Sequence, residues 1–154
     1  MPSNGPRSLD RIIRTLRSLM RSTGLPRPDR LLISTRSGTV HADFTTGAAA
    51  DRLAALLLWV SQLDGLTLSW ELHSDHHLVV TANARTGAGL TFDLKAWADV
   101  SDFDPQPAGG DVVLAGSFRL VPLVVEPVTF EEVARLVHLG RQVAAHRTRA
   151  GVAA

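Results

Sequence analysis

The chain has 154 residues, 45% of them hydrophobic, which is typical of a single domain with a core of its own. It has no cysteine, which excludes disulfide bonds and thiolate metal sites, and no apolar run reaches the roughly 20 residues that cross a bilayer. The net charge of +1 argues against a domain that coats DNA, because such a domain is usually strongly basic.

The charge is unevenly distributed, with basic ends around an acidic middle. Residues 1–36 carry a charge of +6, residues 37–132 a charge of −9 and residues 133–154 a charge of +4. Lys95 is the only lysine among the 16 basic residues, which indicates a GC-rich bacterial genome. Because the start of the chain lacks the continuous apolar run of a secretory signal, we expect a cytoplasmic protein.

The first predicted element is an amphipathic helix from Ser8 to Ser22, whose hydrophobic residues recur at helical spacing on one face. The opposite face carries Arg7, Arg11, Arg14, Arg17 and Arg21. We predict that this arginine face binds a partner, because it can meet acidic side chains or phosphates; a merely solvated face is the alternative. Residues 24–28 contain Gly and two Pro and are predicted to form a connector. We therefore treat residues 1–28 as one segment, a basic amphipathic helix followed by a Pro-rich connector.

Two segments predict β-hairpins with related turns. Residues 30–44 are predicted as two strands joined by Arg36-Ser37-Gly38, and residues 79–94 as two strands joined by Arg85-Thr86-Gly87. In each, glycine ends a three-residue loop, where a left-handed backbone closes the turn.

Between these hairpins, Thr46 to Leu63 is predicted as the most buried helix, capped by Thr46 and stopped by Gly65. Strands are expected at residues 66–73, 77–84 and 89–97. Residues 98–111 are rich in Pro, Gly and Asp and are expected to form a loop. Residues 112–126 are expected to form a further strand that is bent or ends near Pro122.

A last helix is predicted from Thr129, where Thr129 and Glu132 match a capping box. It buries Val133, Leu136, Val137 and Val143 and is expected to fray from His146. The order α-ββ-α-ββββ-α indicates an α+β fold with an antiparallel sheet and helices mainly on one face. Residues 29–149 would form this domain, with the first helix packed on it and 150–154 as a frayed tail.

The strands around the histidine-rich segment 71–80 have one register that pairs apolar residues throughout. Leu72 faces Leu78, Trp70 faces Val80 and Leu68 faces Ala82. This register leaves Ser74-Asp75-His76 as the loop and places His73 opposite His77. The next turn then predicts Val80 opposite Phe92 and His77 opposite Lys95.

The face away from the helices is predicted to be polar. It would carry His41, Asp43, Glu71, His73, His77, Asp93 and Lys95. His73 and His77 are close enough to share a metal ion, with Glu71 or His41 as a third ligand. A solvated sheet face is the alternative that we favour, because no spaced metal motif is present, and we therefore predict no metal and no cofactor.

These features favour a small, non-catalytic binding or regulatory module that interacts with a protein partner, alone or as a homodimer. One alternative is a nucleic-acid-binding accessory protein that uses the arginine-rich terminal helices. The other is a metal- or ligand-binding enzyme on the outer face around His73 and His77, although no nucleophile elbow, phosphate-binding loop or dinucleotide motif is present. The element order loosely resembles small helix-and-sheet chaperone domains and helix-grip domains, a likeness of fold that implies no function.

Overall fold

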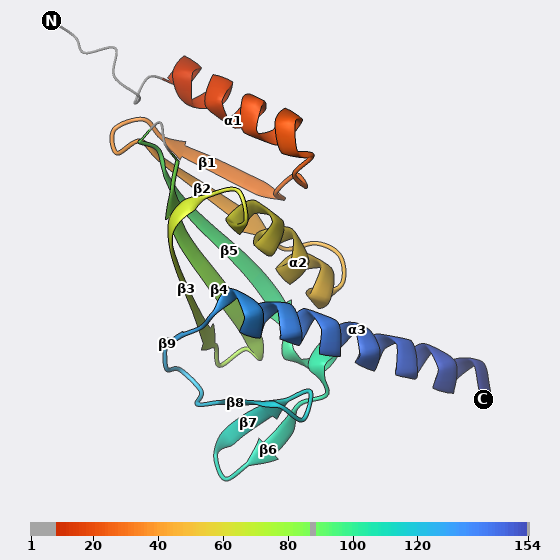
Figure 1. The fold of residues 1–154 in the computed structure, drawn as a ribbon. Coiled ribbons are helices and arrows are strands. Elements are labelled where there is room, and N and C mark those ends of the chain that lie inside the picture. Colours follow the sequence, from red (N-terminus) through yellow and green to blue (C-terminus); the bar gives the residue numbers. More distant parts are fainter. Residues whose placement is uncertain (1–8, 87–88, 154) are drawn as a thin grey trace, which may run out of the picture.

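The computed structural model describes residues 9–86 and 89–153 and contains three α-helices and nine strands in these ranges (Figure 1). The elements are α1 (Leu9–Thr23), β1 (Arg30–Ser34), β2 (Thr39–Phe44), α2 (Ala49–Val60), β3 (Asp64–Leu72), β4 (His77–Arg85), β5 (Thr91–Asp99), the 3-10 helix η1 (Val100–Phe103), β6 (Gln106–Ala108), β7 (Asp111–Leu114), β8 (Phe118–Leu120), β9 (Glu126–Pro127) and α3 (Phe130–Ala153).

The main sheet has six strands in the order β1-β2-β5-β4-β3-β9, and β6, β7 and β8 form a second sheet. The α+β class is confirmed, but the expected antiparallel sheet is wrong, because β2 and β5 are parallel. After β2 the chain forms α2, β3 and β4, and β5 then lies beside β2 and runs in the same direction. Val40 then pairs with Phe92, and Ala42 with Leu94, so apolar side chains align on one face.

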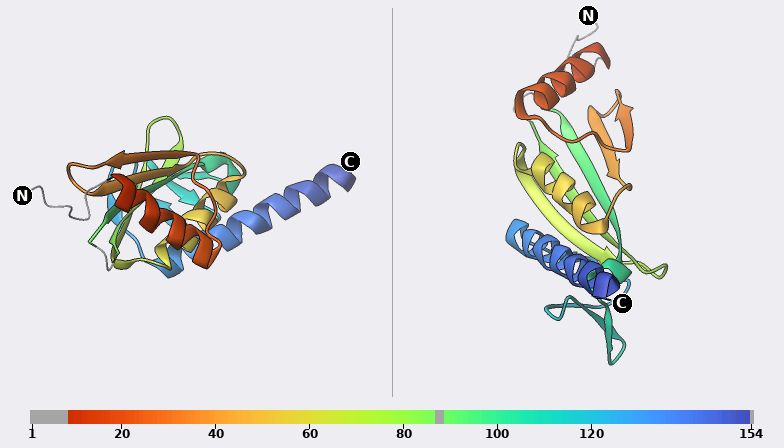
Figure 2. Two further views of the ribbon diagram at one scale, coloured as in Figure 1. Left: turned by 90° about the horizontal axis from the view of Figure 1, so that it is seen from above. Right: turned by 90° about the vertical axis from the view of Figure 1, so that its right-hand side faces the viewer.

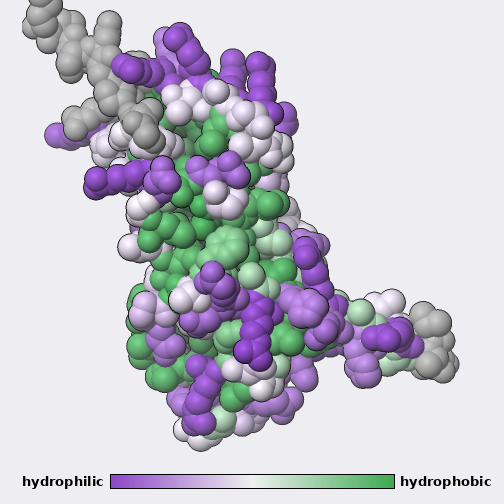
Figure 3. Space-filling model, in the orientation of Figure 1, coloured by the Kyte–Doolittle hydropathy of each residue, from purple (hydrophilic) through white to green (hydrophobic). Residues whose placement is uncertain are grey.

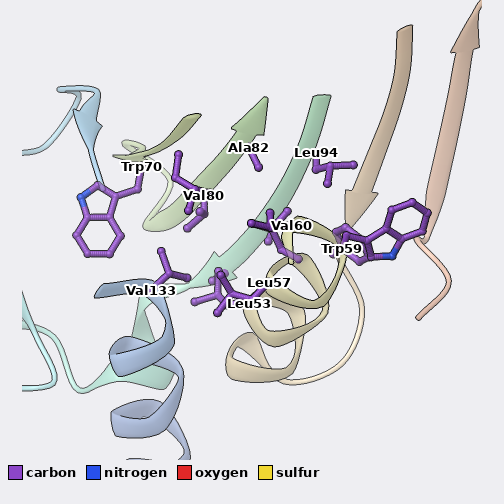
Figure 4. Packing of buried hydrophobic residues seen from close by; sticks show 14 of the residues in the cluster. Leu53, Leu57, Trp59, Val60, Trp70, Val80, Ala82, Leu94 and Val133 are labelled. Carbon is purple, nitrogen blue, oxygen red and sulfur yellow. The ribbon is translucent and has the colours of Figure 1, made fainter. Parts of the chain in front are cut away.

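The helices lie on the apolar face of the main sheet (Figures 1 and 2). Leu53, Leu56 and Trp59 of α2 are fully buried, and the core gathers around them (Figure 4). Ile12 and Leu16 of α1 belong to the same buried cluster. Among the described residues, no helix is both long and apolar enough to cross a membrane.

α2 is shorter at both ends than the sequence predicts, and Thr46 does not cap it. Ala48 occupies the N-cap position, and its methyl side chain cannot accept a capping hydrogen bond. Thr46 instead donates its hydroxyl to Asp29 Oδ1 at 2.5 Å. Gly65, expected to stop α2, lies within β3 at an irregularity of the strand, with φ of 60°.

The first hairpin forms between β1 and β2, with Gly38 at φ 66° as the last residue of its loop. Because Ser34 pairs with Thr39, that loop has four residues where three were expected. The hairpin of β3 and β4 has the predicted register, with Leu72 opposite Leu78 and Trp70 opposite Val80.

The loop of the β3–β4 hairpin is also confirmed. His76 has a left-handed backbone, with φ of 64°, and closes the turn. The amide of His73 donates to the carbonyl of His77 at 2.8 Å, so the two histidines face each other as predicted.

The predicted register between β4 and β5 is wrong by four residues. Val80 pairs with Ala96 rather than Phe92, and His77 pairs with Asp99 rather than Lys95. The turn between the strands lies two residues later than expected, because the amide of Thr86 donates to the carbonyl of Leu90, and the amide of Leu90 donates to Thr86 Oγ1. Gly87, the expected turn residue, lies outside the described residues.

Residues 98–126 are more structured than predicted. The expected loop contains η1 and β6, and the expected single strand is the hairpin of β7 and β8, followed by β9. Ala115 and Gly116 both have positive φ, 51° and 64°, and reverse the chain between β7 and β8. β9 then pairs with β3 and borders the main sheet.

α3 begins as predicted. The amide of Glu132 donates to Thr129 Oγ1, and the Thr129 hydroxyl to Glu132 Oε1, both at 3.1 Å. Val133, Leu136 and Val137 are buried, whereas Val143 is half-buried. The helix continues to Ala153, past His146, from which fraying was expected, and its C-terminal half projects beyond the body (Figure 2).

Candidate functional site: the free edge of β1 and the basic end of the molecule

Among the described residues, β1 is the outermost strand of the main sheet, and β2 is the one strand with which it pairs. Leu31 lies beside Ala42 on the helix side of the sheet, and Leu32 lies beside His41 on the open side. The two leucines are 45% and 54% exposed. An exposed, apolar edge strand offers unpaired backbone groups and hydrophobic side chains to another strand.

The residues around β1 are basic. Arg27, Arg30 and Arg36 are exposed. The one acid among residues 27–36, Asp29, is held by the loop before α2: it accepts hydrogen bonds from Thr45 N at 2.6 Å and Thr46 N at 3.1 Å. The hydrogen bond from the Thr46 hydroxyl, followed by that from the Thr45 amide, lowers the pKa of Asp29 below its ordinary value of 3.8.

The arginine face of α1 is exposed and lies at the same end of the molecule as β1 (Figures 1 and 2). Arg14, Arg17 and Arg21 project from the side opposite to the buried Ile12 and Leu16. Figure 3 shows hydrophilic side chains over this end. Arg11 is also exposed, and Arg7 lies outside the described residues. Partner binding by these arginines stays a prediction.

On the open face, charged residues alternate in rows across β1, β2 and β5. Arg30 pairs with Asp43 and Asp43 with Lys95; in the next row His41 lies between Leu32 and Asp93. These six side chains line a hollow of about 190 Å³. His41 Nδ1 is 3.1 Å from Asp93 Oδ2, and a carboxylate in this position orients the imidazole ring.

The four metal-ligand candidates do not form one group. His73 Nε2 lies 3.4 Å from Glu71 Oε2, while His77 Nδ1 lies 3.3 Å from Asp75 Oδ2. His41 is on β2, three strand spacings from β3, or about 14 Å at the usual spacing. Within the ranges that the structure describes, no three His, Cys, Asp or Glu side chains are grouped so that they could hold a metal ion.

At the tip of the β3–β4 hairpin, ring packing and backbone hydrogen bonds hold the polar side chains. The His73 ring meets the Trp97 ring edge-on, with centroids 5.6 Å apart. Opposite His77, Asp99 accepts a hydrogen bond from the Ser101 amide at 3.0 Å, which lowers the pKa of Asp99.

The sequence did not indicate that Leu31 and Leu32 would form an exposed binding surface. Two consecutive leucines place apolar side chains on both faces of a strand, a pattern usual for strands covered on both sides. The pattern therefore predicts burial, and only the position of β1 in the sheet exposes both residues.

No protein-family model matches the chain, no curated protein sequence matches it, and no solved structure matches it. Similarity to known proteins therefore assigns no function to these surfaces.

Proposed function

We propose that the chain is a non-catalytic protein-binding module that accepts an extended segment of a partner protein along β1. The exposure of Leu31 and Leu32 on a free sheet edge carries this proposal. Strand addition would satisfy the outer backbone groups of β1 and cover both leucines. Burial of the exposed part of each side chain contributes about 1 kcal/mol.

The chemistry around β1 favours an acidic partner segment. A strand added at about 4.8 Å places alternate side chains beside Leu31 and Ile33 on one face and beside Arg30 and Leu32 on the other. Apolar residues suit the first face. Acidic residues suit the second, beside the exposed Arg30, although the hollow next to it holds Asp43 and Asp93 as well as Lys95. The exposed arginines of α1 add long-range attraction.

A synthetic peptide of alternating valine and glutamate tests this proposal, with the matching valine–lysine peptide as its control. We expect the valine–glutamate peptide to bind and to slow hydrogen exchange of the β1 amides, because added hydrogen bonds protect them. The double substitution Leu31→Gln and Leu32→Gln removes the apolar contacts without adding charge and should weaken binding about tenfold or more. The matched control is Leu58→Gln on α2: the Leu58 side chain is 54% exposed, and its replacement should leave peptide affinity unchanged.

Equal binding of both peptides, or binding that leaves β1 exchange unaltered, would contradict strand addition at this edge. Loss of affinity in the Leu58→Gln control would place the binding surface on the helical face instead.

The exposed arginine face of α1 supports a second candidate, nucleic-acid binding. It predicts that affinity for a short DNA duplex falls steeply between low and moderate salt, because arginines displace counterions from phosphates. Replacing Arg14, Arg17 and Arg21 with Gln should then abolish binding. An affinity that does not change with salt would exclude this candidate.

A further inference from the structure

An apolar groove of about 440 Å³ lies between α2 and α3, on the side of the molecule away from the open sheet face. Leu57, Leu58, Phe130, Ala134 and Val137 line it, and His138 and Arg141 border it. Leu58 and Phe130 are 54% and 37% exposed. Figure 3 shows hydrophobic surface in the middle of this face. An exposed groove lined by apolar side chains can accept the hydrophobic surface of another molecule.

The stripe of α3 that lines the groove continues along the projecting half of the helix. Phe130, Ala134, Arg141, Ala145 and Thr148 succeed one another at spacings of three, four or seven residues and therefore share one face. Arg147, on another side of the helix, donates to the carbonyl of Ser101 at 2.8 Å and fixes the projecting half to η1. Residues 144–151 are exposed all round, so this half offers the stripe to another molecule.

The charges of α3 are opposite at its two ends. Glu131 and Glu132 lie in the first turn, and Arg147 and Arg149 lie roughly four to five turns later, all of them exposed. A second α3 in antiparallel orientation would therefore bring acids beside arginines at both ends. The positive end of each helix dipole would also lie beside the negative end of the other, which is favourable. Near the middle of α3, Arg141 forms an ion pair with Asp51 of α2, with the two atoms 3.2 Å apart. Two antiparallel α3 helices would therefore not bring two unpaired arginines together at this point.

We propose that two copies of the chain associate through antiparallel α3 helices, with the projecting half of each copy covering the α2–α3 groove of the other. The 24 residues of α3 span about 36 Å, so the contact can run along the whole helix. Leu58 and Phe130 of one copy pack against Ala145 and Thr148 of the other. Glu131 of one copy lies beside Arg149 of the other. This interface is separate from β1, so each copy keeps its free sheet edge.

Sedimentation equilibrium of the full chain tests the association. We expect a dimer with a dissociation constant in the micromolar range. Leu58→Arg should raise that constant about tenfold or more, because it places a charge in the apolar groove. The matched control is Val125→Arg: Val125 is 62% exposed at the far edge of the sheet, beside β9, and its replacement should leave the constant unchanged. A chain that is monomeric throughout the micromolar range, or a dimer insensitive to Leu58→Arg, would overturn the proposal.

A charge exchange tests the antiparallel orientation. Glu131→Arg and Arg149→Glu should each weaken the dimer several-fold, whereas the double variant should restore it, because the exchanged charges again lie opposite each other. Circular dichroism would confirm that each variant retains its helix. Failure of the double variant to recover would overturn the antiparallel pairing. Weakening by Leu31→Lys with Leu32→Lys would overturn the α3 interface by placing self-association at β1.

Discussion

Asp29 organises the end of the molecule where the β1 edge lies. Its carboxylate accepts hydrogen bonds from the amides of Thr45 and Thr46 and from the hydroxyl of Thr46, residues that lie 16 and 17 positions later. These bonds hold the start of the basic edge strand against the loop that leads into α2. They also explain why α2 begins after Thr46, because the hydroxyl that could have capped the helix is already bonded.

Replacing Asp29 with Ala should lower the free energy of unfolding by about 1 kcal/mol at neutral pH, because three donors lose a charged acceptor at an exposed site. The folded state lowers the pKa of Asp29 below 3.8, so the unfolded chain takes up the proton first. The stabilisation is therefore complete above pH 3.8 and is lost as the pH falls through the lowered pKa. Urea denaturation of the two proteins at neutral and at acid pH measures this; a difference that grows in acid would contradict it.

The same measurement on Asp64→Asn provides a control. Asp64 is exposed at the start of β3, and its replacement should change the stability by less than about 0.5 kcal/mol at either pH.

At the level of elements, the close packing of α3 on η1 depends on one glycine in the middle of a helix. A Cβ at Gly140 would lie 2.6 Å from Cε1 of Phe103 and 3.6 Å from the Cβ of Ala50. Phe103 is fully buried and cannot swing into solvent. Glycine therefore lets α3 approach η1, although it costs the helix about 1 kcal/mol relative to alanine.

Gly140→Ala should destabilise the protein by about 1–3 kcal/mol, because overpacking outweighs the gain in helix propensity. Gly151→Ala in the same helix, where a Cβ would meet open space, should be neutral or slightly stabilising. Thermal unfolding of the two variants compares the effects. Equal stability of the two variants would mean that α3 does not pack closely on η1.

The sheet shows how far strand patterns predict pairing. The β3–β4 register was predictable because apolar residues must match across a three-residue loop, which leaves little freedom. The β4–β5 register was wrong because β5 has apolar residues at alternate positions from Leu90 to Ala98, so a slip of four residues matches them equally well. The slip is even, and it therefore left the predicted outer face, with His77 and Lys95 on it, intact.

For the whole molecule, stability should be concentrated in the central strands. β4 and β5 are paired on both sides, and their inner side chains are buried, whereas residues 144–151 of α3 form a helical segment exposed all round. Short helical segments without tertiary packing are marginally stable in water.

In native-state hydrogen exchange of dilute protein, amides of β4 and β5 should therefore exchange only by global unfolding, and those of residues 144–151 should exchange fastest within α3. Mass spectrometry of proteolytic fragments resolves these segments. Protection of residues 144–151 equal to that of β4, at concentrations where the protein is a monomer, would contradict this distribution.

Local sequence patterns determined the helices, most strands, the Thr129 capping box and the Ser74-Asp75-His76 turn, because each depends on residues close together in the chain. Those patterns also determined which residues face the core. Strand order was decided only by the tertiary structure: β5 lies between β2 and β4, and β1 lies at the edge, because these positions depend on contacts between segments that are distant in sequence. That order separates His41 from His73 and exposes Leu31 and Leu32, so the surface that supports a function arises from topology.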